Sequence, residues 1–316
     1  MHIFSADRLI IMNRFEGLLV LILALLHRTL GCQLAELHLT LGDAFSLSNV
    51  DGKETHVYTI GFTISGNCSP EPLIRLHYGS NPAKDLTAFD TKTINTVVPV
   101  TAYKTMSDGN VTYVRSARFF KIHRADLEGC SGYSLVRGAD IIDGPIAFPK
   151  RPLTTDTNVN LFVVADLDIS PDSMTMIREI ERMDLNKVDL FMHVGDFAYE
   201  IENLNGTVGD EFFNQMSKTA KKVPYIISPG NHEWYAKGHL LNYRFKMPGT
   251  DLNETRANHF FDIVYNGIYF MIVNFDYLYN LHVDEYEKYK GEMYYWMVER
   301  INLLNKRADV KWRVIV

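Results

Sequence analysis

The fold is decided by the stretch Val188-Asp-Leu-Phe-Met-His-Val-Gly-Asp-Phe-Ala-Tyr199. It begins as a largely apolar run, which is typical of a strand inside a parallel sheet, and it ends in Gly195-Asp196-x-x-Tyr199. The apolar run Leu161-Phe-Val-Val164 precedes Asp166 in the same way, and Pro224-Tyr-Ile-Ile227 precedes Gly230-Asn231-His232-Glu233. We therefore predict three strands, each followed by a polar turn.

A helix is predicted between each two of these strands. The first has Ser170 as its N-cap, Pro171 at its first position and an apolar face over 176–183, which are the usual signals of an amphipathic helix start. The second is predicted over 211–222. Strands that alternate with helices indicate βαβ units and a parallel sheet.

The chain after residue 258 is predicted to form a hairpin, a helix and a strand. Apolar runs over 259–264 and 268–273 flank Asn266-Gly267, the sequence preferred by a type I′ hairpin turn. A helix is predicted over 292–307, and the apolar run 312–316 reads as a further strand.

Residues 34–148 have the pattern of an all-β region. Short strand-like runs at 57–64, 73–78 and 111–114 alternate with turn segments rich in glycine, serine and asparagine. This spacing predicts an antiparallel sandwich. Pro149, Pro152 and the polar run 154–157 form a predicted linker to the second half.

Length and composition fit two globular domains. The chain has 316 residues, of which 47% are hydrophobic and 22% charged, with a formal net charge of −6. These values exclude a disordered chain. The negative net charge does not indicate the basic surface that nucleic-acid-binding proteins usually have.

Residues 1–32 are predicted to be a signal peptide. Arg14 is followed by the apolar run 17–26 and then by Gly31. A basic flank, a short apolar core and a small residue at the cleavage site are the parts of a signal peptide. The run is shorter than the roughly 20 apolar residues that span a bilayer. A buried helix and an uncleaved anchor are the alternatives. The expected destination is secretion, or a lysosome- or vacuole-like compartment.

Three cysteines and four glycosylation sequons can be interpreted for an exported chain. Cys32 lies at the expected cleavage point, which leaves Cys68 and Cys130 as the candidate disulfide, with two free thiols as the alternative. The Asn-x-Ser/Thr sequons predict glycosylation in exposed loops. They lie at Asn67, Asn110, Asn205 and Asn253.

The polar residues after the three strands form a candidate metal site. Successive strands of a parallel sheet end at one edge, so Asp166, Asp196 and Asn231 can converge although they lie about 30 and 35 residues apart. Carboxylate, phenolate and amide oxygens suit trivalent iron, manganese or, with imidazole, zinc. One carboxylate can bridge two cations in phosphoester chemistry. The alternative interpretation treats these residues as loop caps and Tyr199 as part of the core.

In these motifs the sequence resembles the purple acid phosphatases, within the calcineurin-like metallophosphoesterases. That family carries Asp-x-Gly, Gly-Asp-x-x-Tyr, Gly-Asn-His-Asp/Glu, Val-x-x-His and Gly-His-x-His in this order. The segment Tyr243–Pro248 and the hairpin from His259 also follow in family order. The resemblance implies an N-terminal fibronectin-III-like sandwich over 33–150. It implies an α/β metallophosphoesterase domain over 156–316, an α/β/β/α sandwich that is C-terminally incomplete.

The resemblance assigns a role to each matching residue. Asp166 and Tyr199 match ligands of the trivalent iron, Tyr199 as the phenolate behind the family's colour. Asp196 matches the bridging carboxylate, and Asn231 matches a ligand of the divalent metal. His232 matches the catalytic histidine that contacts substrate and protonates the leaving alcohol.

The resemblance therefore implies a metal-dependent acid phosphatase. A metal-bound hydroxide at a binuclear centre would attack small phosphomonoesters, with Fe(III) and divalent iron, zinc or manganese as cofactors. No nucleic-acid partner and no transmembrane span after signal cleavage are expected, and a homodimer is left open.

Two departures from the family pattern matter. Asp168 replaces the glycine of Asp-x-Gly, which adds a carboxylate near the metals. Val316 aligns with the valine that opens Val-x-x-His, so the last three histidines of the family are not in this sequence. The chain as written is therefore expected to lack efficient phosphatase activity. The alternatives are a non-catalytic glycoprotein fragment and a related esterase for diesters or nucleotides.

Overall fold

The computed structural model describes residues 32–49, 52–65, 68–79, 81–86, 88, 90–94, 97–100, 109–112, 115–149, 158–199, 201, 203, 206–233, 239–250, 258–275 and 283–316. The predicted signal peptide before Cys32 and most of the predicted linker lie outside these residues, as do Asn67, Asn205 and Asn253. Asn110 lies in the short strand β7.

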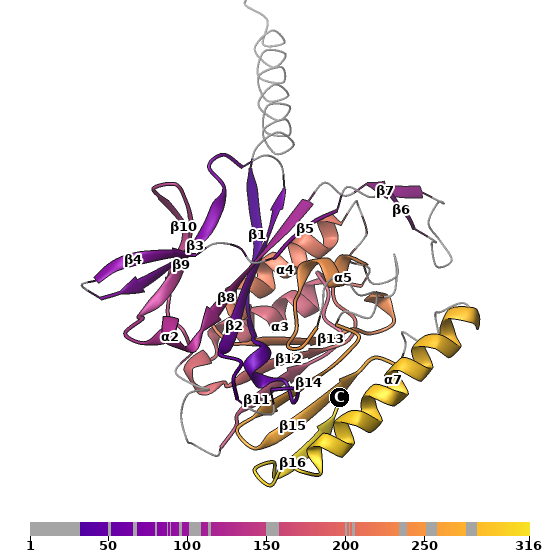
Figure 1. The fold of residues 1–316 in the computed structure, drawn as a ribbon. Helices are drawn as coiled ribbons and strands as arrows, with labels where there is room; N and C mark the ends of the chain where they lie inside the picture. Colours follow the sequence, from indigo (N-terminus) through magenta and orange to yellow (C-terminus); the bar gives the residue numbers. More distant parts are fainter. Residues whose placement is uncertain are drawn as a thin grey trace, which may run out of the picture.

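The N-terminal part is the predicted antiparallel sandwich (Figure 1). One sheet has the order β1-β2-β8-β5 and the other β10-β9-β3-β4, and every paired strand in them runs antiparallel. The strands are β1 (Gln33–Leu41), β2 (His56–Ser65), β3 (Pro72–Tyr78), β4 (Asn81–Leu86), β5 (Asp90–Ile94), β8 (Arg115–His123), β9 (Gly132–Arg137) and β10 (Asp140–Ile146). A separate ribbon joins β6 (Val97–Val100) to β7 (Gly109–Thr112), and two short helices are η1 (Asp43–Phe45) and α2 (Arg124–Leu127).

The second part contains the predicted parallel sheet. Strands β11 (Leu161–Val164), β12 (Leu190–Val194) and β13 (Tyr225–Ser228) pair in parallel in chain order. Helix α3 (Pro171–Arg182) links the first two, followed by η2 (Leu185–Lys187), and α4 (Thr207–Ala220) links the last two. As predicted, Ser170 is the N-cap of α3 and its hydroxyl accepts from the Ser173 amide at 3.5 Å.

A second small sheet follows the short helix α5 (His239–Arg244). The predicted hairpin is β14 (Phe260–Tyr265) and β15 (Ile268–Val273), and its turn has positive φ at Asn266 and Gly267, as a type I′ turn requires. Strand β16 (Trp312–Ile315) pairs in parallel with β15. Helix α7 (Val283–Leu304) begins nine residues before its predicted start.

The disulfide prediction is wrong: Cys32 pairs with Cys68, and Cys130 is a free thiol. The cause is strand register. Because Gln33 of β1 lies opposite Ser65 of β2, the residues just outside these strands meet, and their Cα atoms are 4.7 Å apart. The Sγ atom of Cys130 instead donates to the Gly132 carbonyl at 3.3 Å. Cys32 therefore belongs with the sandwich.

The two parts share one hydrophobic core. Residues of β1, β2 and β8 belong to the same buried cluster as residues of β12, β13 and α4, and β1 packs against both α4 and β13. No helix in the described part of the chain is long and apolar enough to cross a membrane.

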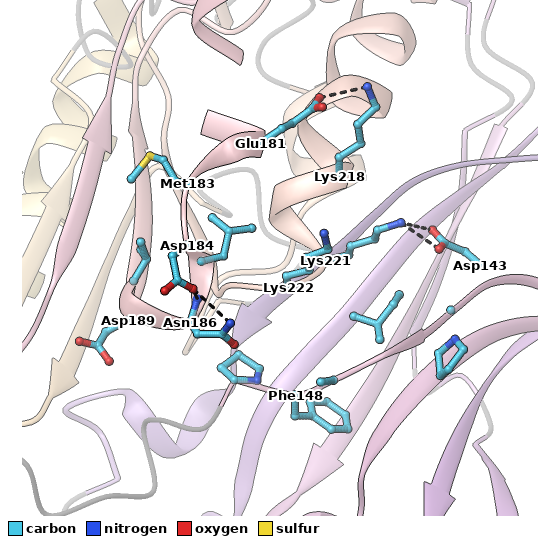
Figure 2. Close-up of a pocket in the computed structure, with 17 residues that line it drawn as sticks. Asp143, Phe148, Glu181, Met183, Asp184, Asn186, Asp189, Lys218, Lys221 and Lys222 are labelled. Atoms are coloured by element: carbon cyan, nitrogen blue, oxygen red, sulfur yellow. Dashed lines mark hydrogen bonds and ion pairs between the residues drawn. The ribbon is translucent and has the colours of Figure 1, made fainter. Parts of the chain in front are cut away.

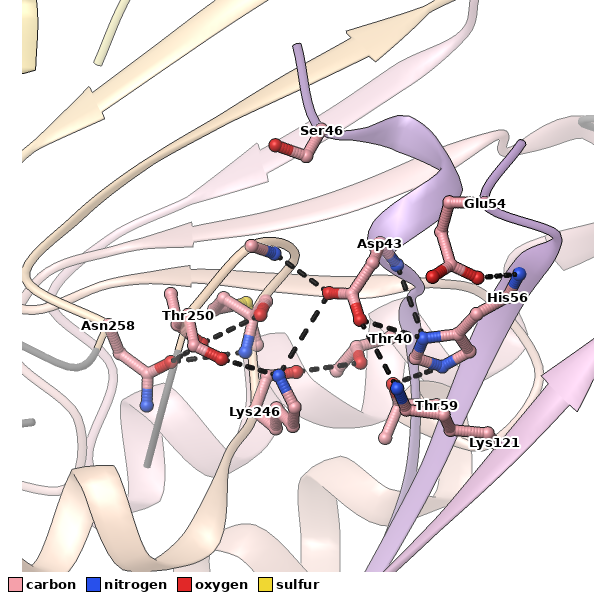
Figure 3. Close-up of polar contacts among 12 residues, drawn as sticks. Thr40, Asp43, Ser46, Glu54, His56, Thr59, Lys121, Lys246, Thr250 and Asn258 are labelled. Carbon is pink, nitrogen blue, oxygen red and sulfur yellow. Dashed lines mark hydrogen bonds and ion pairs between the residues drawn. The ribbon is translucent and has the colours of Figure 1, made fainter. Parts of the chain in front are cut away.

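Polar contacts also fasten the segment 244–250 to the sandwich (Figure 3). The Thr40 hydroxyl donates to the Lys246 carbonyl at 3.0 Å, and Asp43 Oδ1 accepts from the Gly249 amide at 2.9 Å. The other oxygen of Asp43 lies 3.1 Å from His56 Nδ1. Burial opposes the charge on Asp43, but the hydrogen bond from His56 and the Lys246 charge outweigh it and lower its pKa. The sandwich thus holds the chain that follows the Gly-Asn-His-Glu turn.

Candidate functional site

The three polar turns meet at the carboxyl edge of the parallel sheet. The Asp166 amide donates to the Gly195 carbonyl at 3.2 Å, and the Gly195 amide donates to the Ser228 carbonyl at 2.6 Å. Leu167 forms an isolated parallel bridge with Phe197 one residue further on. The loops therefore continue the parallel pairing past the ends of the strands, with the register between the first two shifted by one residue at Leu167 and Phe197.

Four of the predicted site residues contact one another here. The Tyr199 hydroxyl donates to Asp166 Oδ1 at 2.9 Å, and the His232 amide donates to Asp196 Oδ1 at 3.2 Å. The Tyr199 and His232 rings pack edge to face, with centroids 4.8 Å apart. Residues 33 and 36 positions apart in the chain are thus brought together.

The backbone at this edge adopts an uncommon conformation. Asp166, Asp196, Ala198 and Tyr199 all have positive φ, between 44° and 61°, a region that costs free energy for residues other than glycine and is concentrated at functional sites. Gly230 is required for a different reason, because a methyl group there would collide with Asp196 Oδ1. The site is therefore held in place by its surroundings.

Glu233 supplies much of that support, although no separate role was predicted for it. Its carboxylate accepts from the amides of Asp196 at 2.9 Å, Phe197 at 2.7 Å and Gly230 at 2.8 Å. The side chain is fully buried, and burial raises the pKa of Glu233 to about 8 against the opposing effect of these donors. The only sequence signal was its place as the fourth residue of Gly-Asn-His-Glu.

Asn231 and Asp168 lie beside these contacts. Asn231 is exposed and sits between Gly230 and His232, both of which touch Asp196. Asp168 Oδ1 accepts from the Ser170 amide at 2.9 Å and from the Ser170 hydroxyl at 2.5 Å. Partial burial opposes its charge, but these hydrogen bonds lower the pKa of Asp168. Its carboxylate therefore caps the start of α3.

Tyr199 is a neutral phenol in this arrangement. Burial and the hydrogen bond to Asp166 raise the pKa of Tyr199 to about 12. Within the described residues, no three His, Cys, Asp or Glu side chains gather around one point. Asp166, Asp196, Tyr199 and Asn231 offer carboxylate, phenol and amide oxygens at this edge, and the His232 imidazole lies beside them.

A cavity in the described structure lies elsewhere (Figure 2). It measures about 730 Å³ and separates the end of β10 from α3, η2 and α4, and no predicted site residue lines it. Lys221 Nζ lies 2.6 and 2.8 Å from the carboxylate oxygens of Asp143, and Lys218 Nζ lies 3.0 Å from Glu181. The Lys221–Asp143 pair joins its walls across the domain boundary, and the Lys218–Glu181 pair joins α4 to α3.

A family model described as calcineurin-like phosphoesterase matches residues 159–316, which is half of the chain. The chain belongs to the calcineurin-like phosphoesterase family. The match covers all three turns of the candidate site, and the resemblance predicted from their motifs is confirmed.

The curated relatives that match this chain are named acid phosphatase type 7 or probable inactive purple acid phosphatases. Acid phosphatase type 7 of Danio rerio is 39% identical over 80 residues, which cover 25% of this chain and 18% of that protein. The Homo sapiens protein of the same name is 44% identical over 63 residues, 19% of this chain and 14% of that protein. Probable inactive purple acid phosphatase 1 of Arabidopsis thaliana is 30% identical over 117 residues, 32% and 18% of the two chains. The aligned stretches span less than a fifth of the length of these relatives.

A solved structure supports the fold of the phosphoesterase and its sandwich. Purple acid phosphatase PPD1 from yellow lupin seeds matches with a TM-score of 0.53 and 16% identity, over 79% of this chain and 48% of that one. At this identity the likeness concerns the fold alone. The predicted two-part architecture is confirmed.

Proposed function

We propose that this domain hydrolyses phosphomonoesters at a two-metal centre. The observation that carries the proposal is the meeting of Asp166, Asp196, Tyr199 and His232 from different strand ends at one sheet edge. Sites in parallel sheets form at the carboxyl ends of the strands, and oxygen ligands suit hard cations. Membership of the calcineurin-like phosphoesterase family supports the reaction class.

The donor set fits hard cations. Asp166 and Tyr199, which are in contact, would hold trivalent iron. Asp196 would bridge the two cations. Asn231 would hold divalent iron, zinc or manganese. When bound, such a pair of cations polarises a phosphoryl group and supplies a nucleophile at acid pH.

The protein's own groups have distinct tasks in this proposal. As a ligand Tyr199 would bind as the phenolate, and its hydrogen bond to Asp166 places the two oxygen donors side by side. His232 is fixed through its amide on Asp196 and its ring on Tyr199, so its imidazole can protonate the leaving alcohol. Glu233 keeps two of the turns in register through its three amide partners.

A non-catalytic glycoprotein is the second candidate. Several matching proteins of Arabidopsis thaliana are named probable inactive purple acid phosphatases. In this case the site would bind metal without turnover.

We also propose that the chain enters the secretory pathway. The Cys32–Cys68 disulfide is the kind of bond that persists in oxidising compartments. Because Cys32 is bonded within the sandwich, cleavage of the signal peptide would have to occur before it. Asn67, Asn110, Asn205 and Asn253 remain the proposed glycosylation sites.

Hydrolysis of a chromogenic phosphomonoester by the chain at acid pH tests the function. The chain as given is expected to hydrolyse it inefficiently, and whatever turnover it shows is expected to require added iron and zinc, to stop on chelation and to return when the metals are restored. Hydrolysis that persists after the metals are removed would contradict the proposal. Metal binding without any turnover would establish the non-catalytic alternative instead.

A further inference from the structure

A third carboxylate lies in the first turn of the candidate site. Asp168 follows Asp166 by two residues, so their Cα atoms are no more than about 7 Å apart. Leu167 between them is buried, whereas Asp166 is exposed and Asp168 half-buried. The leucine therefore anchors the turn in the core, and both aspartates stay at its surface.

The Asp168 carboxylate is fixed by the start of α3. Its Oδ1 accepts from the Ser170 amide at 2.9 Å and from the Ser170 hydroxyl at 2.5 Å. That hydroxyl in turn accepts from the Ser173 amide at 3.5 Å as the cap of the helix. The carboxylate is thus held at this edge of the sheet by groups that ligate nothing in the proposed metal site.

The same turn is joined to the turn that carries Tyr199. The Leu167 carbonyl accepts from the Ala198 amide at 2.8 Å, and the next residue, Tyr199, donates its hydroxyl to Asp166 Oδ1 at 2.9 Å. After burial and this hydrogen bond, the charge of Asp168 is among those that raise the pKa of Tyr199. Asp168 is therefore within electrostatic range of the proposed ligands of the trivalent cation.

Capping the helix does not by itself require a negative charge at this position. Asparagine and serine accept the same backbone hydrogen bonds as aspartate and are equally common in such turns. A negative charge does matter to a cation, because the affinity of a hard-cation site rises with the number of charges around it. The charge of Asp168 is thus the property that a structural role leaves without a purpose.

We propose that Asp168 supplies an additional negative charge that strengthens the binding of the trivalent cation at Asp166 and Tyr199, while its own carboxylate stays bonded to Ser170. The inference rests on the proposed two-metal site. It gives the site a preference for the more highly charged cation, and it assigns that preference to a residue that is not itself a ligand.

The size of the effect depends on the charge of the cation. The energy between two charges is proportional to their product, so loss of the Asp168 charge weakens a trivalent cation more than a divalent one. Substitutions beside the ligands of a metal site usually lower its affinity by about 10–100-fold. We expect about tenfold weaker binding of ferric iron and, with two-thirds of that energy, about fivefold weaker binding of manganese.

Metal titrations of the full chain and of Asp168→Asn test the inference. Asparagine keeps an oxygen that accepts from Ser170 and removes only the charge. Ferric iron, supplied from citrate, is followed by the visible band of its phenolate complex, and manganese by electron paramagnetic resonance of the free ion. Both titrations are made at pH about 5.5, above the ordinary pKa of aspartate. If Asp168→Asn does not fold, Asp168→Ser, with another neutral capping residue, makes the same comparison.

Asp184→Asn is the matched control. Asp184 Oδ1 accepts from the Asn186 amide at 3.3 Å and from its side-chain nitrogen at 3.2 Å, which is the same kind of local turn. It precedes η2 and therefore lies before the start of β12, at the opposite end of that strand from the candidate site. This variant is expected to bind both cations as the unmodified chain does.

The outcomes separate this inference from the proposed function. Equal ferric affinity in the unmodified chain and in Asp168→Asn would overturn the inference alone. The same fold-loss for iron and manganese would also overturn it, because a charge effect grows with the charge of the cation. An unmodified chain without a ferric band would overturn the proposed function, and this inference with it.

Discussion

Replacement of Arg244 by alanine is expected to lower the free energy of unfolding by about 3–5 kcal/mol, the usual cost of removing one partner from a buried ion pair. Arg244 connects Glu36 of β1 with Asp210 and the Gly206 carbonyl at the start of α4, so three contacts are lost at once. The two carboxylates would then remain buried without their cation. Denaturant unfolding at neutral pH measures the loss.

An exposed pair provides the comparison for this prediction. Arg75 makes two hydrogen bonds to Asp85, at 2.6 and 2.9 Å, but these side chains are 27% and 44% exposed. Arg75→Ala is expected to cost only about 0–1 kcal/mol. Equal losses for Arg75→Ala and Arg244→Ala would show that the buried cluster does not hold the two parts together.

Replacement of Asp196 by asparagine is expected to reduce kcat/KM for a phosphomonoester by at least about 100-fold, the usual scale for losing one group that stabilises developing charge. Asp196 is the proposed bridge between the two metals, and a neutral amide cannot replace a bridging carboxylate. The fold is expected to survive, because an asparagine oxygen can still accept the His232 amide.

The activity and the metal content of Asp196→Asn need to be measured together. Asp140→Asn is the control, because Asp140 is an exposed residue at the start of β10 and is expected to leave both unchanged. An Asp196→Asn variant with unaltered turnover would remove the bridging role from this residue.

The sequence predicted those parts of the fold that depend on local pattern. Apolar runs that end in Asp166, Asp196 and Gly230 placed the parallel strands within a few residues of their observed bounds. The rule that parallel strands end at one edge then predicted that the turns would meet. The Asn266-Gly267 turn signal fixed the hairpin in the same way.

Other features depend on contacts between distant segments, and local pattern could not reveal them. The Cys32–Cys68 bond follows from the register of β1 and β2. The three amide partners of Glu233 become visible only when two turns are adjacent in space. The pairing of Glu36 with Arg244 spans 208 residues, and no spacing in the sequence marks it.

The visible absorption spectrum of the chain titrated with ferric iron tests the central claim most directly, because a phenolate bound to ferric iron absorbs visible light. The account predicts a visible band in the unmodified chain and its loss in Tyr199→Phe, which keeps the ring that packs on His232 but removes the hydroxyl that reaches Asp166. Tyr78→Phe, which alters a hydroxyl bonded to the Asp126 carbonyl in the sandwich, is expected to keep the band. A band of equal strength in Tyr199→Phe, or a colourless iron-bound chain, would contradict the account.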